Sequence, residues 1–174
     1  MQPLGLLKFC EAIGEIDRGK IPDCGSALDW LAGQLHIHTG ADVAIWLAEL
    51  VGGELPDDLD SPARIAMSPG KPAFGSVPLC QLTFLGESAA VGNAAAFTEA
   101  VHDGPKTSPD FTLADGERAL VFRVRLDFAL CWVRVSGPAS LLADRAPWRE
   151  MLPPALHGFL RGVNHDQRLR FRQR

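Results

Sequence analysis

The stretch LDWLAGQLHIHTGADVAIWLAEL, residues 28–50, decides the fold. Leucines 28, 31 and 35 follow the spacing of one face of an α-helix. Gly40 supplies a C-terminal stop for that helix. The segment Asp42–Leu50 then alternates Val43, Ile45 and Leu47 with Ala44, Trp46 and Ala48, so both of its faces are apolar. The stretch therefore predicts a helix followed by a strand that is covered on both faces.

Two more helices are predicted outside this stretch. Leu4–Ile16 carries an apolar stripe at helical spacing. The helix of residues 28–39 is expected to begin at Ser26, because Ser26 and Asp29 fit a capping box. A last helix is expected from Pro153–Pro154 to Arg172, since proline is tolerated in a first turn but not deeper in a helix.

The middle of the chain is rich in glycine, proline and acidic residues. Residues 51–78 are expected to be irregular, with one short strand around Ala63–Met67. A strand at Leu79–Leu85 and a short helix from Asn93 to His102 are predicted to follow.

The clearest strand signal is a hairpin at residues 119–135 with a tight turn near Asp127–Phe128. This turn places Arg123 opposite Trp132 and Val121 opposite Arg134. One face then becomes wholly apolar, whereas a shift of one residue would mix the two sets. The apolar face holds Leu120, Phe122, Val124, Leu126, Ala129, Cys131, Val133 and Val135; the other holds Arg123, Arg125, Leu130, Trp132 and Arg134.

Composition limits the class of protein. The 174 residues, 47% hydrophobic and 22% charged, predict one globular domain and exclude a disordered or collagen-like chain. The net charge is −4, and residues 156–174 carry five arginines against one aspartate. The rest of the chain is therefore acidic, so direct nucleic-acid binding is not expected. No apolar run reaches membrane-spanning length, and Met1–Leu7 lacks the basic start of a secretory signal. We expect a cytoplasmic location, with Cys10, Cys24, Cys80 and Cys131 reduced.

Three stretches together resemble a GAF domain: Thr39–Asp42, which reads TGAD between helix and strand; residues 117–137, similar to the last two strands of that family; and the closing helix with Asn164 and Arg168–Leu169. AFTEAVHDGPK, residues 96–106, is similar to the family's short middle helix and turn. The resemblance covers about residues 4–172 and implies a single α+β domain. It also implies a central antiparallel sheet, with the first and last helices on one face and a small-molecule pocket on the other.

The polar face of the hairpin is the candidate ligand site. Arg123, Arg125 and Arg134 would offer guanidinium groups to a phosphate or carboxylate, and Trp132 would stack on the ligand. Trp46, on the strand of residues 42–50, is the fifth candidate. The alternative is that the three arginines face solvent and cover Trp132 with their stems.

The sequence gives little support for a metal site, for catalysis or for a particular cofactor. His36 and His38 lie two residues apart on a predicted helix end, where they do not share a face, so no metal site is expected. Motifs of the G-x-S-x-G, HExxH and GK[ST] types are absent, and no cofactor can be named.

We therefore expect a non-catalytic sensory or regulatory domain, in signal transduction or transcriptional control. It would bind a small ligand and signal through a homodimer formed by its first and last helices. A downstream domain or a partner protein would receive the signal, and no membrane is involved. The alternative is a scaffold domain of the same fold with a closed pocket.

Overall fold

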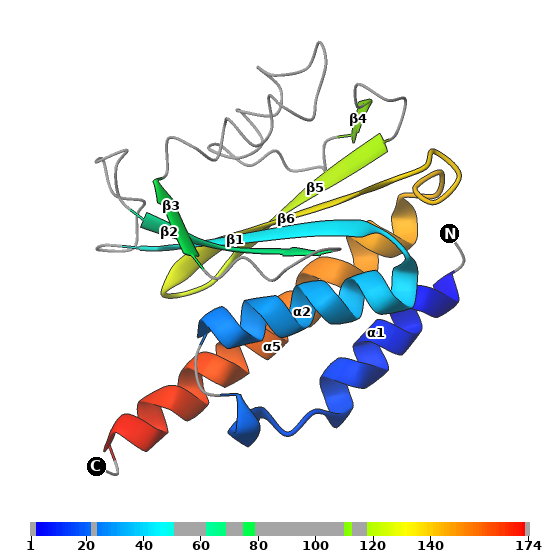
Figure 1. The fold of residues 1–174 in the computed structure, drawn as a ribbon. Helices are drawn as coiled ribbons and strands as arrows, with labels where there is room; N and C mark the ends of the chain where they lie inside the picture. The colour runs from blue at the N-terminus through cyan, green and yellow to red at the C-terminus, as the bar shows by residue number, and fades with distance from the viewer. Residues whose placement is uncertain are drawn as a thin grey trace.

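The computed structural model describes residues 3–21, 24–50, 62–68, 75–78, 110–112 and 118–172. Their strands form one sheet in the order β3-β2-β1-β6-β5-β4, in which all neighbouring strands are antiparallel (Figure 1). The strands are β1 (Asp42–Glu49), β2 (Pro62–Ser68), β3 (Gly75–Pro78), β4 (Asp110–Thr112), β5 (Arg118–Arg125) and β6 (Ala129–Gly137). The mixed α/β architecture with a central antiparallel sheet is the one predicted, and it is consistent with a GAF-like fold.

The helices form two layers on one side of the sheet (Figure 1). They are α1 (Pro3–Glu15), α2 (Cys24–Thr39) and α5 (Ala146–Arg172), with a short 3-10 turn η1 (Arg18–Lys20) between α1 and α2. α2 packs on β1 and β2, and α5 packs on β5. α1 packs on α2 and α5 and forms the outer layer, so the first and last helices lie on the same side of the sheet, as predicted (Figure 1).

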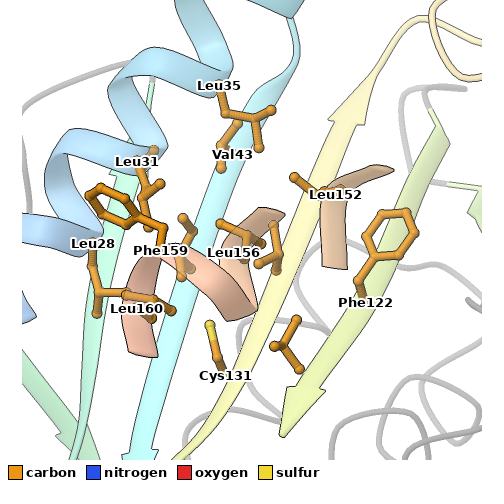
Figure 2. Close-up of a cluster of buried hydrophobic side chains, with 14 of the residues drawn as sticks. Leu28, Leu31, Leu35, Val43, Phe122, Cys131, Leu152, Leu156, Phe159 and Leu160 are labelled. Atoms are coloured by element: carbon orange, nitrogen blue, oxygen red, sulfur yellow. The ribbon is translucent and has the colours of Figure 1, made fainter. Parts of the chain in front are cut away.

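The main core lies between the sheet and the pair α2 and α5. Leucines 28, 31 and 35 of α2 and leucines 152, 156 and 160 of α5 point toward Val43, Cys131 and Phe122 on the strands (Figure 2). All eight residues of the predicted apolar hairpin face belong to this core. Trp30 of α2 and Phe159 of α5 stack with their ring centroids 5.3 Å apart, which ties the two helices together.

The turn from α2 into β1 is fixed by a small set of hydrogen bonds. The Thr39 hydroxyl donates to the carbonyl oxygen of Leu35 at 2.5 Å and accepts from the amide of Ala41 at 3.2 Å. Gly40 has φ +77°, a left-handed conformation that favours glycine and ends the helix as predicted. His36 Nδ1 lies 2.7 Å from the carbonyl oxygen of Ala41.

The start of α2 differs from the prediction. The helix begins at Cys24, so Ser26 lies inside its first turn and is not the N-cap. Ser26 and Asp29 therefore do not form the expected capping box, because the N-cap precedes the first helical residue. The pattern identified the right region, but an N-cap at Ser26 makes Ala27 the first helical residue, three residues after the observed start at Cys24.

The hairpin register is confirmed. Arg123 pairs with Trp132 and Val121 pairs with Arg134. The turn closes where the amide of Leu126 donates to the carbonyl oxygen of Ala129 at 2.8 Å. The same alternation that predicted the register explains it, since any slip would carry arginines into the core.

The last helix is longer than predicted. α5 begins at Ala146 and contains Pro153 and Pro154 in its interior, so the predicted start at the proline pair is wrong. Asp144 accepts a hydrogen bond from the amide of Ala146 at 3.2 Å and stabilises the true start. The prolines remove the helical donors to the carbonyls of Arg149 and Glu150. Both of those residues are exposed, so water can take the place of the lost donors.

In the middle of the chain, β2 confirms the short strand expected around Ala63–Met67. β3 lies inside the segment 51–78 that was expected to be irregular, which corrects that expectation. β3 has only four residues, too few to show the alternation that predicts a strand. It extends the sheet by pairing with the longer strand β2. The strand predicted at Leu79–Leu85 and the helix predicted at Asn93–His102 lie outside the described residues.

Candidate functional site

The five predicted site residues share the sheet face that points away from α2 and α5, called here the second face. Strand register places on it Ala44, Trp46 and Ala48 of β1, Leu130, Trp132 and Arg134 of β6, and Val121, Arg123 and Arg125 of β5. The central row runs across three strands, with Trp46 opposite Trp132 and Trp132 opposite Arg123. The structure thus brings the candidate positions onto one surface.

The neighbouring rows place the other two arginines. Arg134 lies between Ala44 on β1 and Val121 on β5. Arg125 lies opposite Leu130, at the hairpin end of β5. Because directly opposite residues in an antiparallel pair have Cβ atoms about 4.5–5.5 Å apart, Arg123 and Trp132 are immediate neighbours.

Much of the second face is buried. Trp132 is 1% exposed, and Ala44, Ala48, Val121 and Leu130 are also buried, although none of them belongs to the core beneath the helices. Arg123 and Arg134 are half-buried, whereas Arg125 is exposed. The sequence predicted that both faces of β1 are covered, and the burial of Ala44 and Ala48 agrees with this prediction. The alternative, in which the arginines face solvent and cover Trp132 with their stems, fits the exposed Arg125 and stays open for the half-buried Arg123 and Arg134.

The polar groups of the second face are mainly donors. The Nε1 atom of Trp132 is buried and has no hydrogen-bond partner in the described part of the chain. Burial lowers the pKa of Arg134, and the carboxylate of Asp42 acts against that shift. Arg123, Arg125 and Arg134 each take part in an interaction of their own.

Sequence reasoning missed three contributors to this surface. Ala44 and Ala48 are the next positions on the second face along β1 on either side of Trp46, and Asp42 lies near enough to Arg134 to influence its pKa. In the sequence, Ala44 and Ala48 could be assigned to this face because they alternate with Val43, Ile45 and Leu47. Asp42 could not be connected with Arg134, because nothing in the sequence showed that β1 pairs with β6.

The histidines and cysteines with described side chains do not form a second site. Among the described residues, no group of three or more His, Cys, Asp or Glu side chains could hold a metal ion. His36 and His38 lie half-buried at the end of α2. Burial raises the pKa of the Cys131 thiol to about 12 and also raises the pKa of the Cys10 thiol. Both thiols therefore stay protonated at neutral pH, which makes them poor nucleophiles.

Fold and site together define an α+β domain with a helix-covered sheet face and a second face that gathers the buried Trp132 and three arginines. No family model matches the sequence, and no curated protein matches it significantly. None of the helices within the described ranges is long and apolar enough to cross a membrane.

Two solved structures are similar in shape. A candidate transcriptional regulator from Rhodococcus sp. RHA1 has a TM-score of 0.39 and 12% identity, over 97% of this chain and 77% of that chain. An IclR-family transcriptional regulator from Brucella abortus has a TM-score of 0.38 and 12% identity, over 92% of this chain and 68% of that chain. Likeness at this level does not transfer a function, so the function is argued below from the residues themselves.

Proposed function

We propose that this chain is a non-catalytic regulatory domain that binds a small molecule on the second face and signals through its helices. The observation that carries the proposal is the buried, unpartnered indole N–H of Trp132 beside half-buried arginines. An unsatisfied buried donor costs about 1–3 kcal/mol, and a ligand that accepts its hydrogen bond recovers that cost. A ligand site usually contains a few polar groups among mainly apolar side chains.

The sheet gives such a ligand a route to the helices. Along β6, Trp132 alternates with Cys131 and Val133, which lie in the core on the opposite face. α5 packs on β5, the strand that carries Arg123. A ligand that displaces side chains on the second face therefore acts on strands whose other face supports α5, and close packing transmits small shifts.

The helical layer also supports the proposed dimer. Leu4 and Leu7 of α1 are 53% and 49% exposed, and Ile37 near the end of α2 is 68% exposed. Gly5, between the two leucines, approaches the carbonyl oxygen of His38, so the start of α1 crosses the end of α2. Exposed apolar side chains near this crossing are suited to contact with a second copy.

Native mass spectrometry of the purified full chain, followed by the same measurement under denaturing conditions, tests the proposal. We expect a dimer with a small adduct that is lost on denaturation. Leu7→Glu should reduce the dimer fraction, whereas Lys8→Gln, a change at the adjacent exposed position, should not. A monomer without adduct that also fails to gain mass from a small-molecule mixture would contradict the proposal.

The second candidate function is a scaffold domain whose second face is closed. The nearly complete burial of Val121, Leu130 and Trp132 favours it, because a filled face needs no ligand. A dimer that retains no adduct and shows no thermal stabilisation by any small molecule would support this function over sensing.

A further inference from the structure

We infer that α5 contains a hinge at Pro153–Pro154. The hinge lets the C-terminal part of the helix, residues 155–172, change its angle relative to the N-terminal part, residues 146–152. The hinge itself follows from the backbone and the packing of α5. Its use to carry a signal from the second face rests on the proposed function.

The proline pair weakens the helix at one point. Neither Pro153 nor Pro154 has an N–H group, so the carbonyl oxygens of Arg149 and Glu150 lack the donors that a regular helix would supply. A residue that precedes a proline is also disfavoured in the helical conformation, and both Leu152 and Pro153 precede one. Prolines within a helix are a usual cause of a sharp bend. The local chemistry therefore favours a bend at this pair.

The core holds the helix in place on both sides of the pair. Leu152 and Leu156 flank the prolines, and both are 0% exposed and belong to the core. On the other side of the helix, Pro154, Arg149 and Glu150 are exposed. A bend at the pair therefore breaks no helical hydrogen bond to the two carbonyl groups, and water can reach them.

The part of α5 before the pair packs on the sheet. α5 contacts β5, and Figure 2 shows Leu152 on the side of the core where Phe122 of β5 lies. Trp148, one turn earlier in the helix, is 0% exposed and belongs to the same core. These buried side chains tie residues 146–152 to the β5 side of the sheet.

The part of α5 after the pair contacts helical elements. Phe159 stacks on Trp30 of α2, and Figure 2 shows Phe159 on the α2 side of the core. Further along, the guanidinium of Arg18 in η1 lies against Gly162, where a Cβ atom would stand. α2 in turn packs on β1 and β2. The first part of α5 is thus tied to β5, and the second part is tied through α2 to β1 and β2.

These two attachments make the angle of α5 sensitive to the sheet. β6 lies between β1 and β5, and the second face spans all three strands. A ligand that changes the twist between β1 and β5 would move the two attachments relative to each other, and the proline pair can take up that movement. His165 lies roughly 16 Å beyond Pro154 along the helix axis, so a bend of about 20° would move it by about 6 Å.

Distances between two spin labels on the full chain, measured by pulsed electron paramagnetic resonance, test the hinge. One label replaces Asp127 in the turn between β5 and β6, and the other replaces His165 beyond the prolines; both positions are exposed. A genetically encoded ketone amino acid carries each label, so the native cysteines stay in place. An excess of unlabelled chain suppresses distances between copies.

We expect the wild-type distance distribution to be broader by about 6 Å than that of the double variant Pro153→Ala, Pro154→Ala. The double variant regains two helical donors, so it should stay folded and melt about 5 °C or more above the wild type. Pro147→Ala is the matched control. Pro147 lies in the first turn of α5, where a proline removes no helical hydrogen bond, so this change should leave the distribution as it is.

The outcomes separate the hinge from the proposed function. A narrow distribution shared by the wild type and the double variant would overturn the hinge, as would a broad one that the double variant keeps. Equal narrowing by Pro147→Ala would overturn its assignment to the proline pair. If the small molecule found by native mass spectrometry leaves the wild-type distribution unchanged, the use of the hinge in signalling is overturned. A chain that binds no small molecule contradicts the proposed function and leaves the hinge in place.

Discussion

Arg123 on β5 lies directly opposite Trp132 on β6, on the sheet face turned away from the helices. This pair puts a half-buried guanidinium next to a buried indole N–H that has no partner in the described part of the chain. Both groups are hydrogen-bond donors, so neither can accept the other's hydrogen bond.

The first prediction concerns the arginine of this pair. Arg123→Ala should weaken binding of the small molecule identified by native mass spectrometry by about tenfold to a hundredfold, because a charge-assisted hydrogen bond contributes about 1.5–3 kcal/mol. Arg125→Ala is the control, since Arg125 is exposed and lies in the next row. Isothermal titration calorimetry measures both. Equal losses in the two variants would mean that the arginines act only through general charge.

The second prediction concerns the crossing of α1 and α2. A Cβ atom at Gly5 would lie 2.6 Å from the carbonyl oxygen of His38, a backbone atom that cannot move aside cheaply. Gly5→Ala should therefore lower the free energy of unfolding by about 1–3 kcal/mol. Gly14→Ala, on the same helix with nothing within 4 Å of its Cβ position, should raise it by up to about 1 kcal/mol. Urea denaturation measures both, and a harmless Gly5→Ala would show that the helices cross less closely.

The third prediction concerns the hydroxyl group that joins α2 to β1. Thr39→Val removes the group that bonds both Leu35 and Ala41 and should cost about 1–3 kcal/mol of unfolding free energy. Thr39→Ser keeps the hydroxyl and loses one methyl group, which should cost less than about 1 kcal/mol. The order of the two variants in chemical denaturation is the result to examine. A valine variant as stable as the serine variant would contradict the assigned bonds.

The fourth prediction concerns stability at alkaline pH. Burial raises the pKa of the Cys131 thiol in the folded chain to about 12, whereas an unfolded thiol ionises near pH 9.0. The folded state binds the proton more tightly, so this contribution is complete below pH 9 and is lost as the pH rises toward 12. The slope is about 1.4 kcal/mol per pH unit in that window. Cys131→Ala should remove this part of the slope, and an unchanged slope would mean that Cys131 ionises while folded.

Some parts of the fold could be predicted because the local sequence pattern there agrees with the long-range contacts of the folded chain. The Arg123–Trp132 register followed from keeping arginines out of the core, and Gly40 ended α2 because the turn requires positive φ. The start of α5 could not be predicted, because Pro153 and Pro154 resemble a helix start unless the exposure of Arg149 and Glu150 is known. The packing partners of α1 could not be predicted either, because its apolar stripe can pack on other helices as well as on a sheet.

The candidate site was predictable only in its composition. Sequence alternation grouped Arg123, Arg125, Trp132 and Arg134, and the structure places them on one face. Neither the burial of Trp132 nor the influence of Asp42 on Arg134 could be predicted, because both depend on which elements surround the hairpin.

The most direct test of ligand binding on the second face is a ¹⁵N–¹H correlation spectrum of the tryptophan indole groups during titration with the small molecule that native mass spectrometry identifies. Trp132→Phe and Trp148→Phe assign two of the four indole signals. We predict that the Trp132 indole proton moves downfield to saturation, because it gains a hydrogen-bond acceptor, while the Trp148 signal stays in place. A Trp132 signal that does not move at ligand concentrations that stabilise the protein would contradict the account.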